Sequence, residues 1–201
     1  MAEKYKFIFK KNLSLMLVLV IVISIGIIAI EIIKNKADNM NIELGGSFLL
    51  TDQNNIPFDS KSFNKKKLIY FGYTYCPDVC PFDILKLSRF LDENPSIHKD
   101  LKSIFITVDP ERDQPDQIKS FLDNFNPSIV GLTGTSEEIK NVVKKYKIYV
   151  KKNRSSKNDQ NYLVDHSSLF FLVDKNDRYI SHFRPDDFDS KIKSTFLKKI
   201  F

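Results

Sequence analysis

The chain has 201 residues, of which 31 are Lys or Arg and 25 are Asp or Glu, and its formal net charge is +6. The basic residues are scattered among acidic ones and do not form a stripe with interleaved aromatic residues, which argues against binding of nucleic acid. Beyond an N-terminal apolar stretch about 160 residues remain, which is enough for one domain with its own hydrophobic core.

The N-terminal region predicts a membrane anchor. The stretch from Leu13 to Ile30 carries no charge, and it is close to the roughly 20 apolar residues that cross a bilayer as one helix. We therefore expect a cytoplasmic basic segment at 1–12, a transmembrane anchor at 13–33 and a linker at 34–44. A cleaved signal peptide is the alternative, but its apolar region is normally only about 7–15 residues long.

The charges on either side of this stretch predict its orientation. Four lysines and one acidic residue precede it closely, whereas the charges that follow it nearly balance. By the positive-inside rule the protein is a single-pass protein of the inner (cell) membrane, and its domain at 45–201 faces the periplasm or another extracytoplasmic side. Two thiols in that oxidising environment are able to form a disulfide.

The first half of the domain predicts a strand, a loop and a helix. An apolar piece at Phe48–Leu50 comes first, and the continuous apolar run Leu68–Phe71 is typical of a strand covered on both faces. Pro81 fixes its own backbone and disfavours helical geometry in the residue before it, so the next helix is expected to begin at Pro81 and to end before Pro95.

Strands and helices alternate in the second half, which predicts an α/β domain with parallel strand pairing. Asp113 is a candidate N-cap, and the basic stretch 151–157 is interpreted as a solvated loop. The order of elements is that of a thioredoxin-like domain with additions, and its last two strands form an antiparallel hairpin. The expected elements are a strand at Ser103–Val108, a helix at Gln114–Phe125, a strand at Ile129–Leu132, a helix at Ser136–Tyr146, strands at Leu169–Val173 and Tyr179–Phe183, and a helix at Phe188–Phe201.

Cys76 and Cys80 are the only cysteines in the sequence. Both are expected on the loop before the helix that begins at Pro81, where unpaired backbone N–H groups and the helix dipole favour the thiolate. Thiolates serve metal binding and disulfide exchange alike. Three intervening residues leave room for a metal ion between the sulfurs and still permit a disulfide, including a permanent structural one, so spacing alone does not separate these uses.

Three histidines are candidates for a further metal ligand. His98 is expected at the surface of a polar segment and His182 on the surface of a hairpin strand. His166 stands just before a strand, at a junction that packs beside the cysteine loop in a thioredoxin-like fold, although a hydrogen-bonded structural role is the alternative. Two thiolates and one imidazole form a soft three-ligand set that suits Cu(I), and Asp165 is a candidate to orient His166.

Four motifs stand in a characteristic order between Gly45 and Phe183. They are Gly45-Gly46-Ser47-Phe48, then Tyr70-Phe71-Gly72-Tyr73-Thr74 running into Cys76-Pro77-Asp78-Val79-Cys80-Pro81, then Val108-Asp109-Pro110-Glu111-Arg112-Asp113, and then Asp165-His166-Ser167-Ser168. Together they resemble the Sco/SenC family of membrane-anchored copper proteins. The cysteine motif with its preceding strand is specific to that family, whereas each of the other motifs is weak by itself.

The resemblance implies a thioredoxin-like domain that holds a copper ion through Cys76, Cys80 and His166. It also implies a role as a chaperone that helps to assemble the dinuclear copper centre of cytochrome c oxidase subunit II, whose exported domain is then the partner. The two cysteines further resemble a redox pair that reduces the cysteines of the target. The chain departs from the family pattern at Asn64–Lys67 and at the turn Lys175–Asp177, where a glycine is common, and neither departure touches a proposed ligand.

Two other functions fit parts of the same sequence. A metal-free, membrane-anchored thiol-disulfide oxidoreductase needs both thiols but not His166. An adhesive or scaffolding domain uses the cysteines only as a structural disulfide. The histidine before the last hairpin favours copper over both.

Overall fold

A computed structural model describes residues 20–32, 44–156 and 159–197. The chain divides into two compact units, Met1–Ile42 and Glu43–Phe201.

The predicted anchor at 13–33 falls only partly on described residues. Residues 20–32 form a helix whose side chains are exposed. Among the residues that the structure describes, none of the helices has both the length and the apolar character that a membrane span requires. Residues 13–19 and 33 lie outside the described residues, as does most of the predicted linker at 34–44, so both remain predictions.

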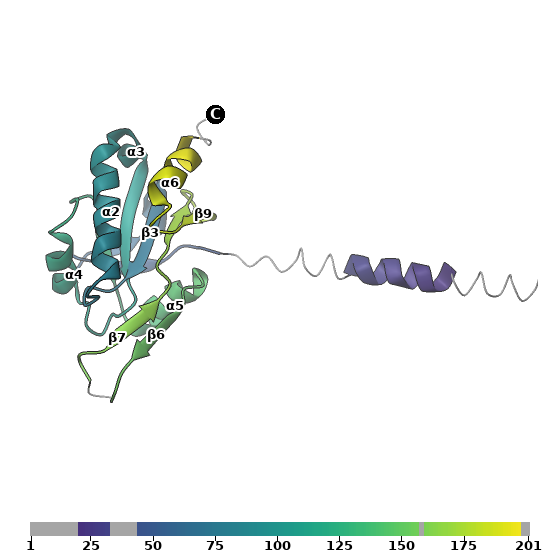
Figure 1. Cartoon of the computed structure of the whole chain (residues 1–201), viewed down its shortest axis with the longest axis horizontal. Coiled ribbons are helices and arrows are strands. Elements are labelled where there is room, and N and C mark those ends of the chain that lie inside the picture. The colour runs from purple at the N-terminus through teal and green to yellow at the C-terminus, as the bar shows by residue number, and fades with distance from the viewer. Residues whose placement is uncertain (1–19, 33–43, 157–158, 198–201) are drawn as a thin grey trace, which may run out of the picture. The chain divides into compact units, whose positions relative to one another are not determined.

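A seven-stranded sheet forms the centre of the described domain, in the order β2-β1-β5-β4-β3-β8-β9 (Figure 1). The central strand β3 (Lys66–Gly72) is parallel to β4 (Leu101–Thr107), which is parallel to β5 (Val130–Thr133). On its other side β3 is antiparallel to β8 (Phe170–Val173), which pairs with β9 (Tyr179–Phe183). The predicted α/β class, the parallel pairing and the final antiparallel hairpin are confirmed.

The edge of the sheet that begins the domain is antiparallel. The predicted apolar piece contributes to β1 (Leu49–Asp52), which pairs with both β5 and β2 (Pro57–Asp59). A short 3-10 turn, η1 (Ser60–Ser62), follows β2.

Helices cover the sheet on both faces because β3, β4 and β8 carry large apolar side chains toward each of them. Tyr70, Phe105 and Phe170 point to one face, where the ring centroids of Tyr70 and Phe170 are 4.9 Å apart. Phe71 and Phe171 point to the other face, with centroids 5.9 Å apart. The helices are α2 (Val79–Glu93), α3 (Pro95–Asp100), α4 (Pro115–Leu122), α5 (Ser136–Lys145) and α6 (Phe188–Leu197), of which α2 and α6 lie on the same face (Figure 1).

Helix α2 begins two residues earlier than predicted. Asp78 occupies the N-cap position and Val79 is the first helical residue, so Cys80 lies in the first turn of the helix and not on the loop. Pro81 is tolerated there because the first N–H groups of a helix have no partner within it, and a missing N–H therefore breaks no bond.

The predicted N-cap role of Asp113 is wrong. Gln114 occupies that position for α4, and it makes no side-chain capping bond. The carboxylate of Asp113 is fully buried and accepts hydrogen bonds from the Thr107 hydroxyl (2.7 Å) and from the backbone N–H of Thr74 (2.9 Å). Asp113 therefore ties the end of β4 to the start of the cysteine loop.

A second, two-stranded sheet was not predicted from the sequence. The strands β6 (Val150–Asn153) and β7 (Leu163–His166) pair antiparallel with each other, and this hairpin extends away from the main sheet (Figure 1). The basic stretch was interpreted as a solvated loop, but Lys152 pairs with Asp109 at 2.6 Å. Its polar composition gave no strand signal, because only one face of β6 is even partly buried.

The two departures from the family pattern meet in a buried ion pair. Lys67 Nζ lies 2.8 Å from Asp177 Oδ1, and both side chains are 0% exposed. Ser60 donates a hydrogen bond of 2.7 Å to the other carboxylate oxygen. Asp177 has a φ of +62°, which Asp tolerates better than most residues. The turn without glycine is thus held by the start of the central strand.

Removing the charge of Lys67 is predicted to destabilise the domain strongly. Lys67→Met leaves the Asp177 carboxylate buried without its partner, and breaking a buried pair in this way costs about 3–5 kcal/mol. Lys67→Met combined with Asp177→Asn should cost less than Lys67→Met alone, because no lone charge remains. Urea unfolding of the full chain in a mild detergent, followed by circular dichroism, measures both.

The exposed neighbour Lys65 supplies the control. Lys65→Met should change the free energy of unfolding by no more than about 0.5 kcal/mol. An equally small loss for Lys67→Met would contradict a stabilising role for the buried pair.

Candidate metal centre

Both cysteines lie where the central strand β3 gives way to helix α2. Cys76 is half-buried in the connecting loop, and Cys80 is buried in the first turn of the helix. Gly72 ends β3, and a Cβ atom at this position would lie 2.8 Å from a ring carbon of Tyr70 and 3.1 Å from Cys80 Sγ. The glycine therefore allows the helix to bring Cys80 directly against the end of the strand.

The two sulfurs share a hydrogen-bonding environment at the helix start. The backbone N–H of Cys80 points to Cys76 Sγ at 3.5 Å. The Cys80 thiol also donates to Cys76, and this bond is the largest cause that lowers the pKa of Cys76 to about 5. Backbone N–H groups of Cys80 and Asp78 and the Tyr73 hydroxyl act in the same direction, against the opposing effect of partial burial.

The same bond has the opposite effect on Cys80. Donating its proton to Cys76, together with burial, raises the pKa of the Cys80 thiol far above its usual range. At neutral pH the pair is therefore one thiolate, on the more accessible Cys76, and one thiol, on the buried Cys80. The sequence predicted thiolate character for both, and the structure assigns it to Cys76.

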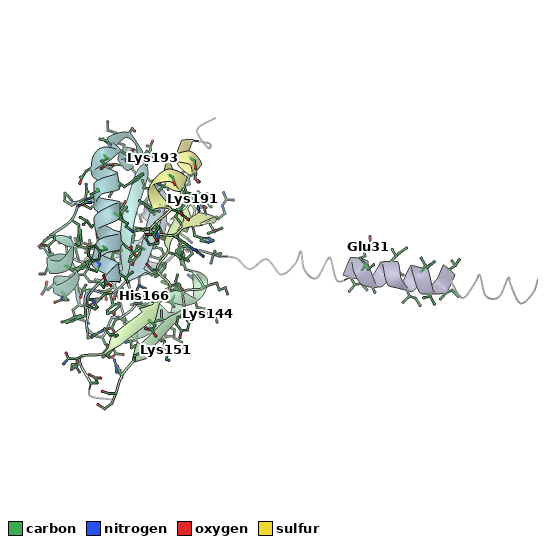
Figure 2. The ribbon with its side chains drawn as sticks, viewed as in Figure 1. Glu31, Lys144, Lys151, His166, Lys191 and Lys193 are labelled. Carbon is green, nitrogen blue, oxygen red and sulfur yellow. The ribbon has the colours of Figure 1, made fainter. Side chains whose placement is uncertain are left out.

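His166 is the last residue of β7 and lies where the hairpin joins the rest of the domain (Figure 2). Its Nε2 atom is 3.6 Å from Cys80 Sγ, and its Nδ1 atom is 3.3 Å from the carbonyl oxygen of Val164. A carbonyl oxygen only accepts hydrogen bonds, so Nδ1 is the nitrogen that donates to Val164, and Nε2 is the nitrogen that faces the sulfur. The Val164 carbonyl holds the ring where Asp165 was expected to act, and the Asp165 side chain is exposed.

The other two histidines lie elsewhere on the domain. His98 is partly buried in α3, which follows the far end of α2. His182 is exposed on β9, and its Nδ1 atom is 2.6 Å from the Tyr179 hydroxyl. Of the three candidates, the structure thus brings only His166 to the cysteines.

The donors at this site have the chemistry of a soft-metal site. Within the described parts of the chain, no three His, Cys, Asp or Glu side chains are grouped closely enough to form a ready-made metal site. An ion bound at about 2.3 Å from sulfur and about 2.0 Å from an imidazole nitrogen, as in zinc sites, nevertheless spans the 3.6 Å between Cys80 Sγ and His166 Nε2. Cys76 adds the thiolate beside them.

A buried carboxyl group lies beneath Cys80 and was not singled out from the sequence. Asp83 Oδ2 accepts hydrogen bonds from the Tyr70 hydroxyl (2.9 Å) and the Ser168 hydroxyl (2.5 Å). Burial is the main cause that raises the pKa of Asp83. The available signal was its position three residues after Cys80, which places both on one face of the helix. Through Ser168, this group fixes the chain two residues beyond His166.

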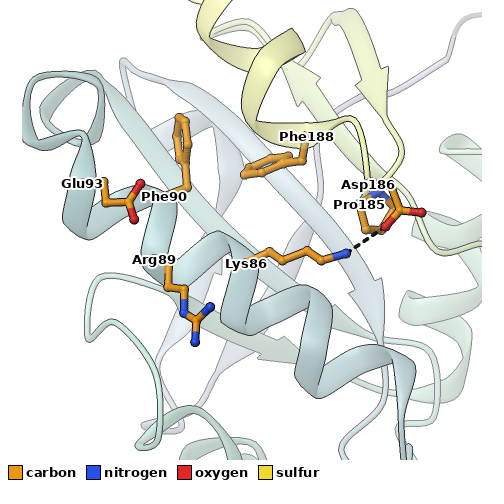
Figure 3. Close-up of a pocket in the computed structure, with 7 residues that line it drawn as sticks. All are labelled: Lys86, Arg89, Phe90, Glu93, Pro185, Asp186 and Phe188. Atoms are coloured by element: carbon orange, nitrogen blue, oxygen red, sulfur yellow. Dashed lines mark hydrogen bonds and ion pairs between the residues drawn. The ribbon is translucent and has the colours of Figure 1, made fainter.

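A separate groove of about 370 Å³ lies between α2 and α6 (Figure 3). Lys86 and Asp186 face each other across its rim at 3.0 Å. Its lining residues are Lys86, Arg89, Phe90, Glu93, Pro185, Asp186 and Phe188. None of the proposed copper ligands lines this groove.

Comparison with known proteins identifies the family. The SCO1/SenC family model matches residues 36–200, and the chain belongs to this family. It is 42% identical over 156 residues to an SCO2-like protein of Rickettsia prowazekii, which covers 77% of this chain and 76% of the relative.

Solved structures of the family share the fold. Yeast Sco1 with copper bound has a TM-score of 0.71 at 38% identity, covering 79% of this chain and 88% of that one. BsSco, a member of the Sco family of cytochrome c oxidase assembly proteins in which a disulfide switch was identified, has a TM-score of 0.59 at 27% identity, covering 74% and 91%. The predicted thioredoxin-like fold is confirmed as that of Sco proteins.

The low pKa of Cys76 predicts how its reactivity toward alkylating agents depends on pH. The thiolate is the nucleophile, so the rate at which iodoacetamide modifies Cys76 should rise with pH around a midpoint near the pKa of about 5. Cys80→Ala removes the donor that contributes most to this lowering, so its midpoint should move to higher pH. Mass spectrometry of the reduced full chain locates and quantifies the modification.

Cys80→Ser serves as the matched control, because its hydroxyl still donates a hydrogen bond to Cys76. Its midpoint should stay below that of Cys80→Ala. A wild-type midpoint near the ordinary cysteine pKa of about 8.5 would show that Cys76 is not activated.

Proposed function

We propose that this chain is a membrane-anchored copper chaperone. It binds one copper ion through Cys76, Cys80 and His166 and delivers it to the dinuclear copper site of cytochrome c oxidase subunit II. The observation that carries this proposal is the approach of His166 Nε2 to within 3.6 Å of Cys80 Sγ, next to the Cys76 thiolate. Membership of a family that includes copper-bound yeast Sco1 and cytochrome c oxidase assembly proteins supports it.

The protonation of the site determines how copper enters. Cys76 is already a thiolate and His166 Nε2 faces Cys80 Sγ, so of the two cysteines only Cys80 has to release a proton. Copper binding is therefore expected to become tighter as the pH rises.

The number of proposed ligands and their exposure are consistent with delivery of the copper ion to a partner. A set of three soft ligands leaves a position open for a donor from the partner. Cys76 is more accessible than Cys80, so the exported domain of subunit II is expected to approach the ion from the side of Cys76.

The N-terminal unit is proposed to anchor the domain in the inner (cell) membrane. The helix at 20–32 is apolar on every side apart from Ser24 and Glu31, and its large apolar side chains are exposed. Helices of this kind are buried in a core or span a membrane. With the basic segment at 1–12 in the cytoplasm, a single span at 13–33 puts the copper site on the periplasmic or other extracytoplasmic side.

The polarised pair also supports a second function, the reduction of a disulfide in the target. The Cys76 thiolate attacks one sulfur of that disulfide, and the target's other sulfur leaves as a thiolate. Cys80 then loses its proton and attacks Cys76 Sγ, which releases the second target sulfur as a thiolate. Two electrons pass to the target, whose thiolates take up protons, and Cys76 and Cys80 end as a disulfide. A metal-free thiol-disulfide oxidoreductase would perform only this reaction.

A Cu(I) titration of the reduced full chain, without oxygen and in a mild detergent, tests the proposal. The wild type should bind one copper ion. Cys76→Ser, Cys80→Ser and His166→Ala should each lower the affinity by more than the roughly 10–100-fold that loss of an outer-shell partner costs. Affinity is measured by competition with a coloured Cu(I) chelator.

The exposed His182 provides the matched control, and His182→Ala should bind copper as the wild type does. If the wild type holds no copper, or if His166→Ala binds as tightly as the wild type, the three-ligand site is wrong. The metal-free oxidoreductase then becomes the better description.

A further inference from the structure

His166 belongs to a hairpin that no described strand of the main sheet pairs with, although Cys80 is fixed by that sheet. Beyond His166, the chain is secured by Ser168, which bonds Asp83. Before His166, side chains connect the hairpin to the loop that follows β4. Arg112, in that loop, contacts both the hairpin and the cysteine loop.

Arg112 binds the hairpin at the start of β7. Its Nη1 atom donates to the carbonyl oxygens of Gln160 (3.1 Å) and Tyr162 (3.0 Å). Its Nε atom donates to Asp109 at 2.5 Å, and Asp109 also accepts a hydrogen bond of 2.7 Å from the Tyr162 hydroxyl. The bonds to Gln160 and Tyr162 join segments of the chain that lie about 50 positions apart in sequence. The Arg112 side chain is only 8% exposed.

The same guanidinium group lies against the cysteine loop. Its central carbon is 3.6 Å from the ring centroid of Tyr162, 4.8 Å from that of Tyr75 and 5.7 Å from that of Tyr73. Tyr75 directly precedes Cys76. The Nη2 atom of Arg112 is buried without a hydrogen-bond partner among the described residues. Attraction between the cation and the rings compensates there for a missing bond.

Tyr73 connects Arg112 to His166 because its ring contacts both side chains. Its hydroxyl accepts a hydrogen bond of 3.3 Å from the backbone N–H of Val164. Its ring meets the His166 ring edge-on, with the centroids 5.7 Å apart. The Val164 carbonyl in turn contacts His166 Nδ1. The position of the hairpin thus determines where Nε2 lies relative to Cys80.

We propose that Arg112 is a positioning residue that clamps the β6–β7 hairpin to the cysteine loop and thereby holds His166 at copper-binding distance from Cys80. The significance for copper rests on the proposed function. A lysine cannot replace it, because lysine keeps the charge but lacks the planar fork that bonds two carbonyls and a carboxylate while it stacks on aromatic rings.

The test is a double-mutant cycle on Cu(I) affinity, made on the reduced full chain in detergent with Arg112→Lys, His166→Ala and the double variant. Arg112→Lys should weaken binding by roughly 10–100-fold, as loss of a residue that orients a ligand does. In the His166→Ala background Arg112→Lys should have no further effect, because the ligand that it positions is already gone.

Arg154 supplies a matched control for the same substitution. Its guanidinium carbon also lies over the Tyr162 ring, at 4.1 Å, and it pairs with Glu111, but its described contacts do not include the cysteine loop. Arg154→Lys should therefore leave Cu(I) affinity within about twofold of wild type, because none of the described contacts of Arg154 is with the cysteine loop.

A second readout needs no copper. Amide hydrogen exchange at Val164 reports whether its N–H still bonds to Tyr73. In the metal-free protein this exchange should be faster in Arg112→Lys than in wild type, and unchanged in Arg154→Lys.

Each outcome decides the proposal. Unchanged affinity in Arg112→Lys, or an equal loss in the presence and absence of His166, overturns it. If the wild type binds no copper, the proposed function fails, and exchange at Val164 alone decides whether the clamp exists. If Arg112→Lys does not fold, Tyr75→Leu replaces it, because Tyr75 is 50% exposed and supplies only the loop side of the clamp. It should weaken copper binding through His166 alone.

Discussion

The site depends on the contact between His166 and Cys80. The two residues belong to parts of the fold that are positioned in different ways, one by the main sheet and the other by side-chain contacts of a separate hairpin. Cys80 is placed by backbone geometry, because β3 ends in a glycine and α2 begins directly above it. His166 comes from a hairpin outside the main sheet, so side-chain contacts must bring it there. The main sheet and the helix that follows its central strand position the cysteines, whereas side-chain contacts have to position the histidine.

The hydrogen bond between the two thiols gives them different roles. Cys76 is the accessible thiolate and Cys80 the buried thiol, although both stand at the start of the same helix. The copper binding and the disulfide exchange that we propose each begin from this polarised state, and each requires the loss of the Cys80 proton. The two proposed reactions differ in the third participant, which is His166 with the metal ion in one and a sulfur of the target in the other.

An element could be predicted from the sequence where its buried residues form a recognisable apolar pattern. The strands β3 and β4 were predicted because they are apolar runs covered on both faces. The strand β6 was missed because its sequence Val-Lys-Lys-Asn has only one partly buried face. Asp113 was assigned to capping from local spacing, whereas its partners, Thr74 among them, lie in another segment. His166 was found because its neighbours form a motif, but Arg112 could not be assigned a role without tertiary contacts.

The residues that the sequence analysis did not identify hold the proposed ligands in position. The hydroxyl of Tyr70 and the carboxyl of Asp83 underlie Cys80, and Ser168 connects them to the chain just past His166. Arg112 acts on the chain just before His166. The histidine is therefore held from both sides along the sequence, by a buried hydrogen-bonded network on one side and by the Arg112 cation among aromatic rings on the other. A ligand held in this way needs no strand pairing to the sheet, because its two neighbouring segments are each fixed to the cysteine half of the site.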